Sequence, residues 1–236
     1  MRNNTLYTIG YAGKDIDTFI ACLKKFNITC LVDVRTSPYS KTFPEYNGPS
    51  LKEKLKQEGI LYAHFGKEFG ARREEKEAYS FVYDLDGKSY EKVCFDKVYQ
   101  LEAFQKGFER IENALNQEYT VCFMCSEKRP VHCHRFWMVG FFYATRSYPY
   151  EVINIISLDE TQTVEETIAE STYKKDKDKF YKEHDELNEV SLVPLKVPNW
   201  VSFWDRLFKS DDNEWNKIQN YSNILIGYSK GEEEND

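Results

Sequence analysis

The chain has 236 residues, of which 41% are hydrophobic and 16% aromatic, a composition typical of a folded protein with a sizeable core. No apolar run approaches the roughly 20 residues of a membrane helix, and the first residues lack the apolar stretch of a signal peptide, so we expect a cytoplasmic protein without a membrane partner. The net charge of −7 is uneven, with 22 Lys and Arg against 20 Asp and Glu up to residue 155 and 10 against 19 beyond it, so neither part has the basic excess of a broad nucleic-acid surface.

Short apolar runs alternate with helical patterns over the first two thirds of the chain. In chain order they predict a strand over 6–9, a helix over 15–26, a strand over 29–34, a helix over 49–57, a strand over 60–64, a helix over 101–116, a strand over 120–124, a very apolar helix over about 130–144 and a strand over 150–156. Gly59 is expected to end the second helix, and residues 66–98 are polar without a clear pattern. The alternation predicts an α/β fold in three layers, with a mostly parallel sheet of about five strands and helices on both faces.

The pattern changes after the last predicted strand, so we expect an α/β domain over residues 1–156 and an acidic, partly helical C-terminal extension over residues 157–236. Aromatic and apolar side chains recur at helical spacing over residues 200–208, and a second apolar patch covers residues 215–226. These segments either fold back on the main domain or offer a helix to a protein partner.

The six cysteines are expected to be free thiols, because an intracellular chain of this size keeps its cysteines reduced. Cys22 falls in a predicted helix and Cys30 in a predicted strand. Cys122 and Cys125 lie on or just after one predicted strand. Cys122 is interpreted as a small core residue.

Polar side chains follow the predicted strands where ligands bind in parallel sheets, outside the carboxyl ends. Tyr11 follows the first strand, Asp33 and Arg35 end the second, and His64 ends the third. Arg35 is expected to hold an anion, and Asp33 to bind a hydroxyl or to orient a histidine. A purely structural ion pair between Asp33 and either Arg35 or a later arginine is the alternative.

Three of these candidates have equally plain structural interpretations. Tyr11 is expected either to stack on a ring of the ligand or to pack as an aromatic lid. Ser40 offers a hydroxyl to a phosphate, although loop serines usually cap or contact solvent. His64 is more typical of a hydrogen-bonded residue at a strand end than of a ligand.

Residues 125–135 concentrate reactive and charged side chains between a strand and a helix. They include Cys125, Glu127, Arg129, His132, Cys133, His134 and Arg135. A helix with Pro130 in its first turn would present free N–H groups and partial positive charge, and the two arginines add fixed charge. Such a segment is suited to a phosphate, sulfate or carboxylate, and the same field favours the thiolate form of a cysteine. Glu127 and His134 are candidate acid and base groups.

Three interpretations of this segment compete. In the first it is a catalytic anion pocket, with Cys125 as nucleophile or Glu127 as acid or base. In the second Cys125, His132, Cys133 and His134 bind a metal, but structural zinc sites usually take two separated ligand pairs, so we expect no metal and no other cofactor. In the third the cysteines are packing residues and Arg135 pairs structurally. For Glu127, His134 and Arg135 taken together, the functional interpretation is favoured.

Several short stretches between residues 5 and 156 follow one known pattern. They are Thr8-Ile9-Gly10-Tyr11, Leu31-Val32-Asp33-Val34-Arg35 with Pro38, Ser40 and Phe43, Gly59-Ile60-Leu61-Tyr62, Gly70 with Arg72, Ser89-Tyr90-Glu91-Lys92-Val93, Phe104-Gln105-Lys106-Gly107, Glu109-Arg110-Ile111, and Met124-Cys125-Ser126-Glu127-Lys128 with Pro130 and Cys133-His134-Arg135. Through them the chain resembles the family of domain of unknown function 488. Ala71 departs from the pattern, which usually has a second glycine there.

The resemblance implies an α/β domain with a Cys/Glu/His/Arg site and, by association, a substrate related to nucleotides or nucleic acids. The leading hypothesis is an enzyme, a hydrolase or transferase, that acts on a small anionic substrate or nucleotide. Cys125, Glu127 and His134 would be catalytic, and Tyr11, Asp33, Arg35, Ser40, Arg129, Cys133 and Arg135 would bind the substrate. A nucleic-acid partner is possible but is not supported by the charge.

Two alternatives remain open. The Asp-Val-Arg run and the Cys–Arg loop also resemble sulfurtransferases of the rhodanese type, although the loop here is short and acidic. The other alternative is a non-enzymatic anion-binding adaptor that contacts a protein partner through the aromatic segment over residues 200–208.

Overall fold

The computed structural model describes residues 4–83, 89–145 and 150–173. The chain divides into two compact units, residues 1–161 and 162–236, and each is described by itself. In the second unit the described helix is α7, Val164–Tyr173. The aromatic segment over residues 200–208 and the apolar patch over 215–226 lie outside the described residues. Within the described ranges, none of the helices has the length and apolar character needed to span a membrane.

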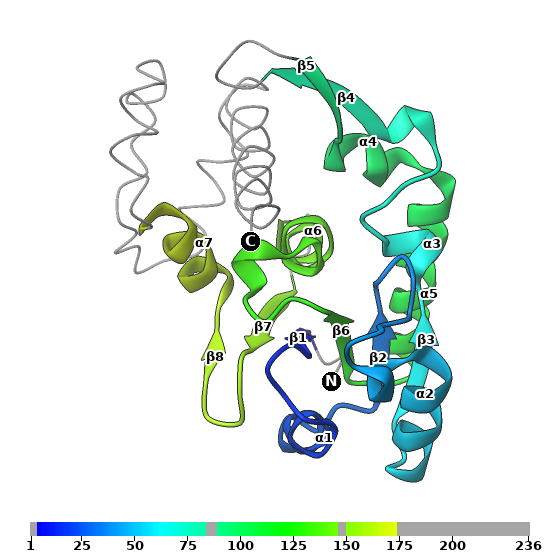
Figure 1. Ribbon diagram of the computed structural model, residues 1–236, viewed down its shortest axis with the longest axis vertical. Helices are drawn as coiled ribbons and strands as arrows, with labels where there is room; N and C mark the ends of the chain where they lie inside the picture. The colour runs from blue at the N-terminus through cyan, green and yellow to red at the C-terminus, as the bar shows by residue number, and fades with distance from the viewer. Residues whose placement is uncertain (1–3, 84–88, 146–149, 174–236) are drawn as a thin grey trace. The chain divides into compact units, whose positions relative to one another are not determined.

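The chain contains a six-stranded sheet with the order β3-β2-β6-β1-β7-β8 (Figure 1). Its strands are β1 (Thr5–Gly10), β2 (Cys30–Asp33), β3 (Leu61–His64), β6 (Val121–Cys125), β7 (Glu151–Ile155) and β8 (Thr161–Gln162). The pairs β1–β6, β1–β7, β2–β3 and β2–β6 are all parallel. The five predicted strands and the mostly parallel sheet are confirmed, and β8 is too short to be recognised from its sequence.

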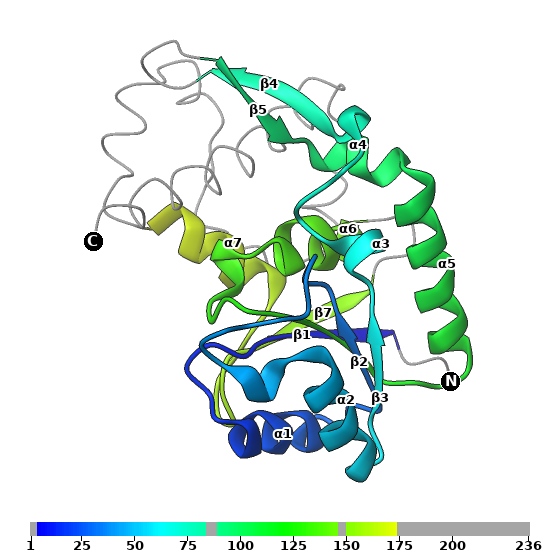
Figure 2. The same ribbon diagram turned by 45° about the vertical axis from the view of Figure 1, so that its right-hand side comes forward.

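Helices cover both faces of the sheet, as predicted (Figure 2). On one face lie α1 (Ile16–Lys25), where Asp15 caps the N-terminus by accepting from Thr18 N at 2.7 Å, and α2 (Gly48–Gln57). The predicted stop at Gly59 is confirmed, since this residue has a φ of +72° beyond the end of α2. On the other face lie α5 (Glu102–Asn116) and α6 (Phe141–Thr145).

Alternating side chains of β6 fill the two layers. Cys122 and Met124 belong to the buried cluster that includes residues of α1 and α2. Phe123 points to the opposite layer, where its ring contacts Phe69 and Tyr143. Every residue of β6 is buried, as expected for a central parallel strand covered on both faces.

The polar region over residues 66–98, which has no clear sequence pattern, contains several short elements. They are α3 (Gly66–Phe69), the 3₁₀ turn Lys76–Ala78, β4 (Tyr79–Tyr83), β5 (Ser89–Val93) and α4 (Phe95–Gln100). Strands β4 and β5 form an antiparallel pair outside the main sheet. A further 3₁₀ turn, Pro44–Tyr46, precedes α2.

The prediction of one helix over about 130–144 is wrong at its start, whereas the helical character of its later part, over residues 134–145, is confirmed. A 3₁₀ turn over Pro130–His132 ends at Cys133, whose backbone is extended with φ −131° and ψ 136°. A π-helical stretch over Arg135–Gly140 follows, and α6 comes after it. The extended residue prevents helix continuation, so Pro130 begins a separate turn rather than the helix. Wide π-type turns are frequent at functional sites.

The direction in which the chain moves across the sheet reverses at β6, so the carboxyl end of β6 lies at this reversal. The chain runs from β1 through β2 to β3 on one side, and then returns to β6, which lies between β1 and β2. In open α/β sheets ligands bind outside the carboxyl ends of the strands at such a switch point. The segment that follows β6 is therefore the first place to look for a site.

Candidate functional site

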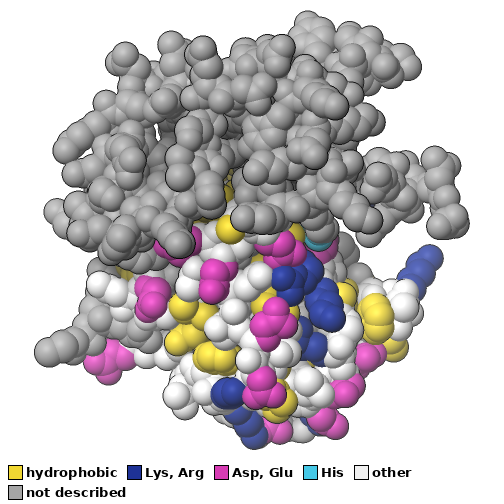
Figure 3. All heavy atoms as spheres, turned by 90° about the vertical axis from the view of Figure 1, so that its left-hand side faces the viewer, with side chains coloured by type: hydrophobic (Ala, Val, Ile, Leu, Met, Phe, Trp, Pro, Cys, Tyr) yellow, Lys and Arg dark blue, Asp and Glu magenta, His cyan; other side chains and the backbone are white. Residues whose placement is uncertain are grey.

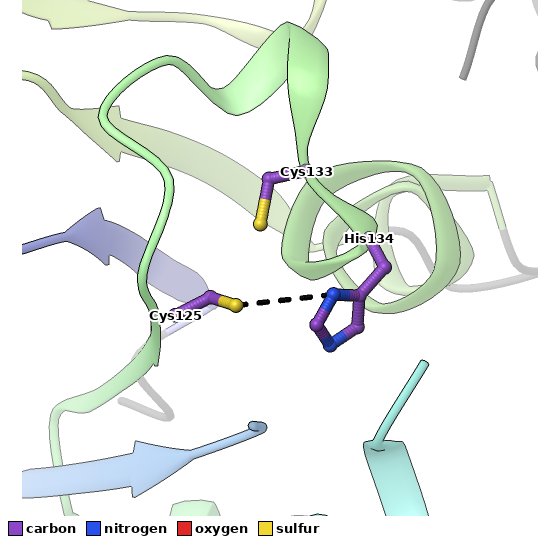
Figure 4. A group of neighbouring side chains, drawn as sticks. All are labelled: Cys125, Cys133 and His134. Atoms are coloured by element: carbon purple, nitrogen blue, oxygen red, sulfur yellow. Dashed lines mark hydrogen bonds between the residues drawn. The ribbon is translucent and has the colours of Figure 1, made fainter. Parts of the chain in front are cut away.

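A cysteine and a histidine face each other at the end of β6 (Figure 4). The Cys125 Sγ lies 3.8 Å from Nδ1 of His134, and the opposite ring nitrogen, Nε2, lies 3.0 Å from the carbonyl oxygen of Val34. Because a carbonyl only accepts, Nε2 carries the ring proton of the neutral histidine, and Nδ1 presents its lone pair to the thiol. The pair can exchange a proton directly.

Glu127 and Cys133 form a second, partly buried contact beside this pair. The Cys133 thiol donates to Oε2 of Glu127 at 2.9 Å. Burial opposes ionisation of Glu127, but hydrogen bonding, led by the Cys133 thiol, outweighs it and lowers the pKa of Glu127 to about 2. Burial raises the pKa of the Cys133 thiol. Glu127 is therefore an anion at neutral pH, where it does not serve as a proton donor, and Cys133 is a thiol.

The charge on Glu127 also acts on the histidine. Burial favours the neutral ring of His134, yet its pKa is raised because Cys133, the carbonyl of Val34 and Glu127 all favour the protonated form. An imidazolium beside Cys125 is therefore stabilised by its surroundings, which helps the ring to accept the thiol proton.

Arg135 holds the loop that carries these groups. Its fully buried guanidinium donates from Nη1 to the carbonyl oxygen of Glu127 at 2.6 Å, from Nη2 to that of Lys128 at 3.2 Å, and from Nε to Thr8 Oγ1 at 3.3 Å. Gly10 lets the loop approach β1, since a Cβ placed on it would lie 1.8 Å from the Glu127 oxygen. The loop is therefore fixed to β1 by backbone contact and by a buried cation.

The residues that end β2 form a buried ion pair. Asp33 Oδ2 accepts from Arg35 Nη2 at 2.6 Å and from the Tyr62 hydroxyl at 2.8 Å, and Asp33 Oδ1 accepts from Arg35 Nε at 2.9 Å. This is the Asp33–Arg35 pair that the sequence offered as a structural alternative. Tyr62 is the member that sequence reasoning missed, and the signal for it is its place on β3, directly beside β2 in the sheet.

One nitrogen of the Arg35 guanidinium makes no hydrogen bond to Asp33 or to another group of the described residues. Nη2 also donates to the Tyr46 carbonyl oxygen at 2.8 Å, but buried Nη1 has no hydrogen-bond partner within the described ranges. The guanidinium lies over the ring of Tyr11, 5.2 Å from its centroid, and the Tyr11 amide donates to the Cys125 carbonyl oxygen at 3.2 Å. A buried donor without a partner costs free energy, and Nη1 is such a donor in the part of the chain that the structure describes.

The remaining sequence candidates have local partners. Ser40 Oγ accepts from the Phe43 amide at 3.1 Å within its own loop. His64 Nε2 lies 2.8 Å from the Arg35 carbonyl oxygen, as expected for a hydrogen-bonded residue at a strand end. Arg129 Nη1 pairs with Glu160 Oε1 at 3.0 Å near the surface. The structure thus brings together Cys125, Glu127, Cys133 and His134. Ser40, His64 and Arg129 instead contact groups outside this set.

A subset of the site has the chemistry of a soft-metal site. The ligand atoms of Cys125, Cys133 and His134 lie within 4.8 Å of one another, whereas His132 is not part of the group. Thiolates and imidazole nitrogen are the ligands of zinc. In the described arrangement these atoms already face other partners: the Cys133 thiol is directed at Glu127, and His134 Nδ1 at Cys125. All six cysteines are free, as predicted.

The face of the molecule drawn in Figure 3 carries mixed charge. A small group of Lys and Arg side chains lies among Asp, Glu and apolar side chains on the described part of this face. The pattern agrees with the near-neutral balance of residues 1–155.

Comparison with known proteins adds one finding to this geometry. A family model described as domain of unknown function DUF488 matches residues 15–142, which include the whole segment from Cys125 to Arg135. Neither curated proteins nor solved structures give a significant match. The matched range covers more than half of the chain, and the chain belongs to the DUF488 family.

Proposed function

We propose that the chain is an enzyme in which Cys125 is a nucleophile activated by His134 and the substrate carries an anionic group. The observation that carries the proposal is the Sγ–Nδ1 distance of 3.8 Å together with the contact of Nε2 to the Val34 carbonyl oxygen at 3.0 Å. A nucleophile in reach of a base that is itself oriented by a third group is the arrangement used in covalent catalysis.

In the proposed reaction, His134 Nδ1 takes the Cys125 proton and the thiolate attacks an electrophilic carbon or phosphorus of the substrate. The imidazolium then returns the proton to the leaving group, and water or a second substrate releases the covalent intermediate. Glu127 remains charged and stabilises the imidazolium. Both hydrolase and transferase chemistry fit this scheme.

The anionic character of the substrate rests on Arg35. Its Nη1 is an unused buried donor, and Tyr11 joins the Arg35 guanidinium to the backbone of Cys125 through a ring contact and an amide hydrogen bond. Arg135 has a positioning role in this proposal, because its donors are directed at the loop and at Thr8. A phosphate or carboxylate on a nucleotide-like molecule is the proposed ligand, with Arg35 as its principal contact.

Charge-matched alkylating reagents test this proposal. Iodoacetate and iodoacetamide attack the same thiol and differ in charge, so the ratio of their rates at Cys125 reports on an anion-binding group nearby. We expect iodoacetate to be favoured in the native chain, and Arg35→Gln to reduce that preference by about tenfold. Arg110→Gln, at an exposed arginine that pairs with Glu68, is the matched control and should keep the native ratio.

Cys125→Ser identifies the labelled site by abolishing rapid modification, which mass spectrometry of the peptides then confirms. An iodoacetate preference that is absent, or unchanged in Arg35→Gln, contradicts the anion-binding part of the proposal. Slow and uniform alkylation of all the cysteines contradicts the proposal that Cys125 is an activated nucleophile.

A further inference from the structure

Cys133 is a second thiol beside the proposed nucleophile, and the reaction scheme does not use it. The sulfurs of Cys125 and Cys133 lie within 4.8 Å of each other, and Figure 4 shows both side chains pointing into the same space. They come from different elements, Cys125 from the end of β6 and Cys133 from the extended residue that interrupts the helical segment. Cys122, by contrast, lies in the layer of α1 and α2.

The surroundings of the two thiols differ in a way that separates their roles. Cys125 has a histidine to take its proton, which makes it the thiol that reacts first with an electrophile. Cys133 keeps its proton, which is directed at the Glu127 carboxylate at 2.9 Å, so it is the thiol left to react second. Reversible dithiol sites combine one reactive thiol with one resolving thiol close to it.

We propose that Cys125 and Cys133 are a peroxide-reactive pair that forms a reversible intramolecular disulfide. The oxidant is hydrogen peroxide, which is small enough to reach sulfurs whose residues are 2% and 1% exposed. The reductant is a small dithiol. The inference stands on the position of the two sulfurs, and only its effect on activity rests on the function proposed above.

The first step oxidises Cys125. Its thiolate attacks one peroxide oxygen, the O–O bond breaks, and the sulfur becomes a sulfenic acid. The departing hydroxide takes the proton that His134 had accepted and leaves as water.

The second step forms the disulfide. The Cys133 sulfur attacks the sulfenic sulfur, the S–O bond breaks, and the S–S bond forms while the hydroxyl leaves with the Cys133 proton as water. Overall, the two thiols give two electrons to one peroxide, and the products are one disulfide and water.

Closure brings the two sulfurs from a separation within 4.8 Å to the roughly 2 Å of a disulfide bond. The backbone near Cys125 is held by Arg135 and by the close approach to Gly10, so the two residues start from a fixed relation. The disulfide removes the nucleophile and leaves Glu127 without its thiol donor.

Peptide mapping of the full chain tests the pair. Trypsin cleaves after Lys128, whereas the Arg129–Pro130 bond resists it, so Cys125 and Cys133 fall on peptides 111–128 and 129–135. After one equivalent of hydrogen peroxide and alkylation of the remaining thiols, we expect these peptides to be joined, and dithiothreitol to separate them. Cys122→Ser is the matched control because Cys122 shares the first peptide, and it should leave the link intact.

Cys133→Ser should lose the link and accumulate at Cys125 a sulfenic acid that dimedone traps. Absence of the linked peptides in the native chain, or the same oxidation product in Cys133→Ser as in the native chain, overturns the inference. If no disulfide forms, iodoacetamide labelling of Cys133→Ser before any oxidation shows whether the proposed function fails as well. Rapid labelling of Cys125 there supports the Cys125–His134 pair even if no disulfide forms.

Discussion

At the scale of single residues, groups of the site fix the orientation or the charge of their neighbours. In the proposed reaction, His134 can act as a base because the Val34 carbonyl fixes which ring nitrogen faces Cys125. Glu127 keeps its charge because hydrogen bonding, led by the Cys133 thiol, outweighs the effect of burial. Each of these dependencies gives a substitution with a distinct outcome.

Gly10→Ala tests the close approach between β1 and the loop after β6. A Cβ at this position would meet the Glu127 carbonyl at 1.8 Å and Arg135 Nη1 at 3.1 Å, so backbone must move. We expect a loss of about 1–3 kcal/mol in the free energy of unfolding, with slower alkylation of Cys125. Urea unfolding and labelling kinetics measure both effects. Gly13→Ala, at a residue with φ +77° but room for a Cβ, distinguishes backbone strain from collision with the loop.

Glu127→Gln tests the low pKa of this carboxyl. Because the folded-state pKa lies at about 2, below the ordinary value of 4.5, the charge stabilises the fold fully above pH 4.5 and this stabilisation is lost as the pH falls toward 2. We expect the native chain to lose about 1–3 kcal/mol more than Glu127→Gln over this range. Unfolding by urea at several acidic pH values measures the difference. Equal acid sensitivity in the two proteins would contradict the assigned pKa.

At the scale of elements, the segment after β6 is organised by a buried arginine rather than by a helix N-terminus. Arg135 begins the π-helical stretch and reaches back to two carbonyls of the preceding loop and to Thr8 of β1. This side chain therefore joins three elements around the Cys125–His134 pair.

Arg135→Lys tests this joining role with the charge retained. A lysine cannot reach the Thr8 hydroxyl and both carbonyl oxygens with the planar geometry of a guanidinium. We expect a loss of about 2–4 kcal/mol in the free energy of unfolding, because buried acceptors are left unsatisfied, and weaker reactivity of Cys125. Thermal unfolding and labelling kinetics give the two readouts. Native reactivity in a folded Arg135→Lys protein would mean that the loop does not depend on the guanidinium.

The same segment shows how far sequence reasoning reaches. Strands β2 and β6 follow from continuous apolar runs, because both are buried throughout. The break at Cys133 leaves no such signal, since it depends on contacts between this residue and the loop rather than on local propensity. The grouping of Cys125, Glu127 and His134 was predicted from their density, whereas the fixing of His134 by Val34 requires the sheet order, with β6 directly beside β2.

At the scale of the whole molecule, the chain is acidic and its acidity is concentrated after residue 155. The face in Figure 3 mixes both signs of charge over the described residues. Tight binding to nucleic acid without sequence preference usually needs a basic surface that releases counterions.

A binding titration at two salt concentrations tests this expectation. We expect the full chain to bind fluorescent duplex or single-stranded DNA weakly at physiological salt, with a dissociation constant above about 10⁻⁶ M. Fluorescence anisotropy measures the affinity, and a basic DNA-binding domain serves as the positive control. Strong binding with a steep salt dependence would instead indicate a basic surface that this face does not show.

The central claim is that His134 activates Cys125, and the pH dependence of Cys125 alkylation tests it most directly. Rates of iodoacetamide labelling at this residue are compared in the native chain and in His134→Gln, whose side-chain amide can still donate to the Val34 carbonyl but offers no base. We predict that the native chain is labelled at least about tenfold faster than His134→Gln at about pH 6, and that the two rates converge toward about pH 10, where a thiol ionises without help. The same pH profile in both proteins would contradict the claim and leave Cys125 as a buried thiol without a catalytic partner.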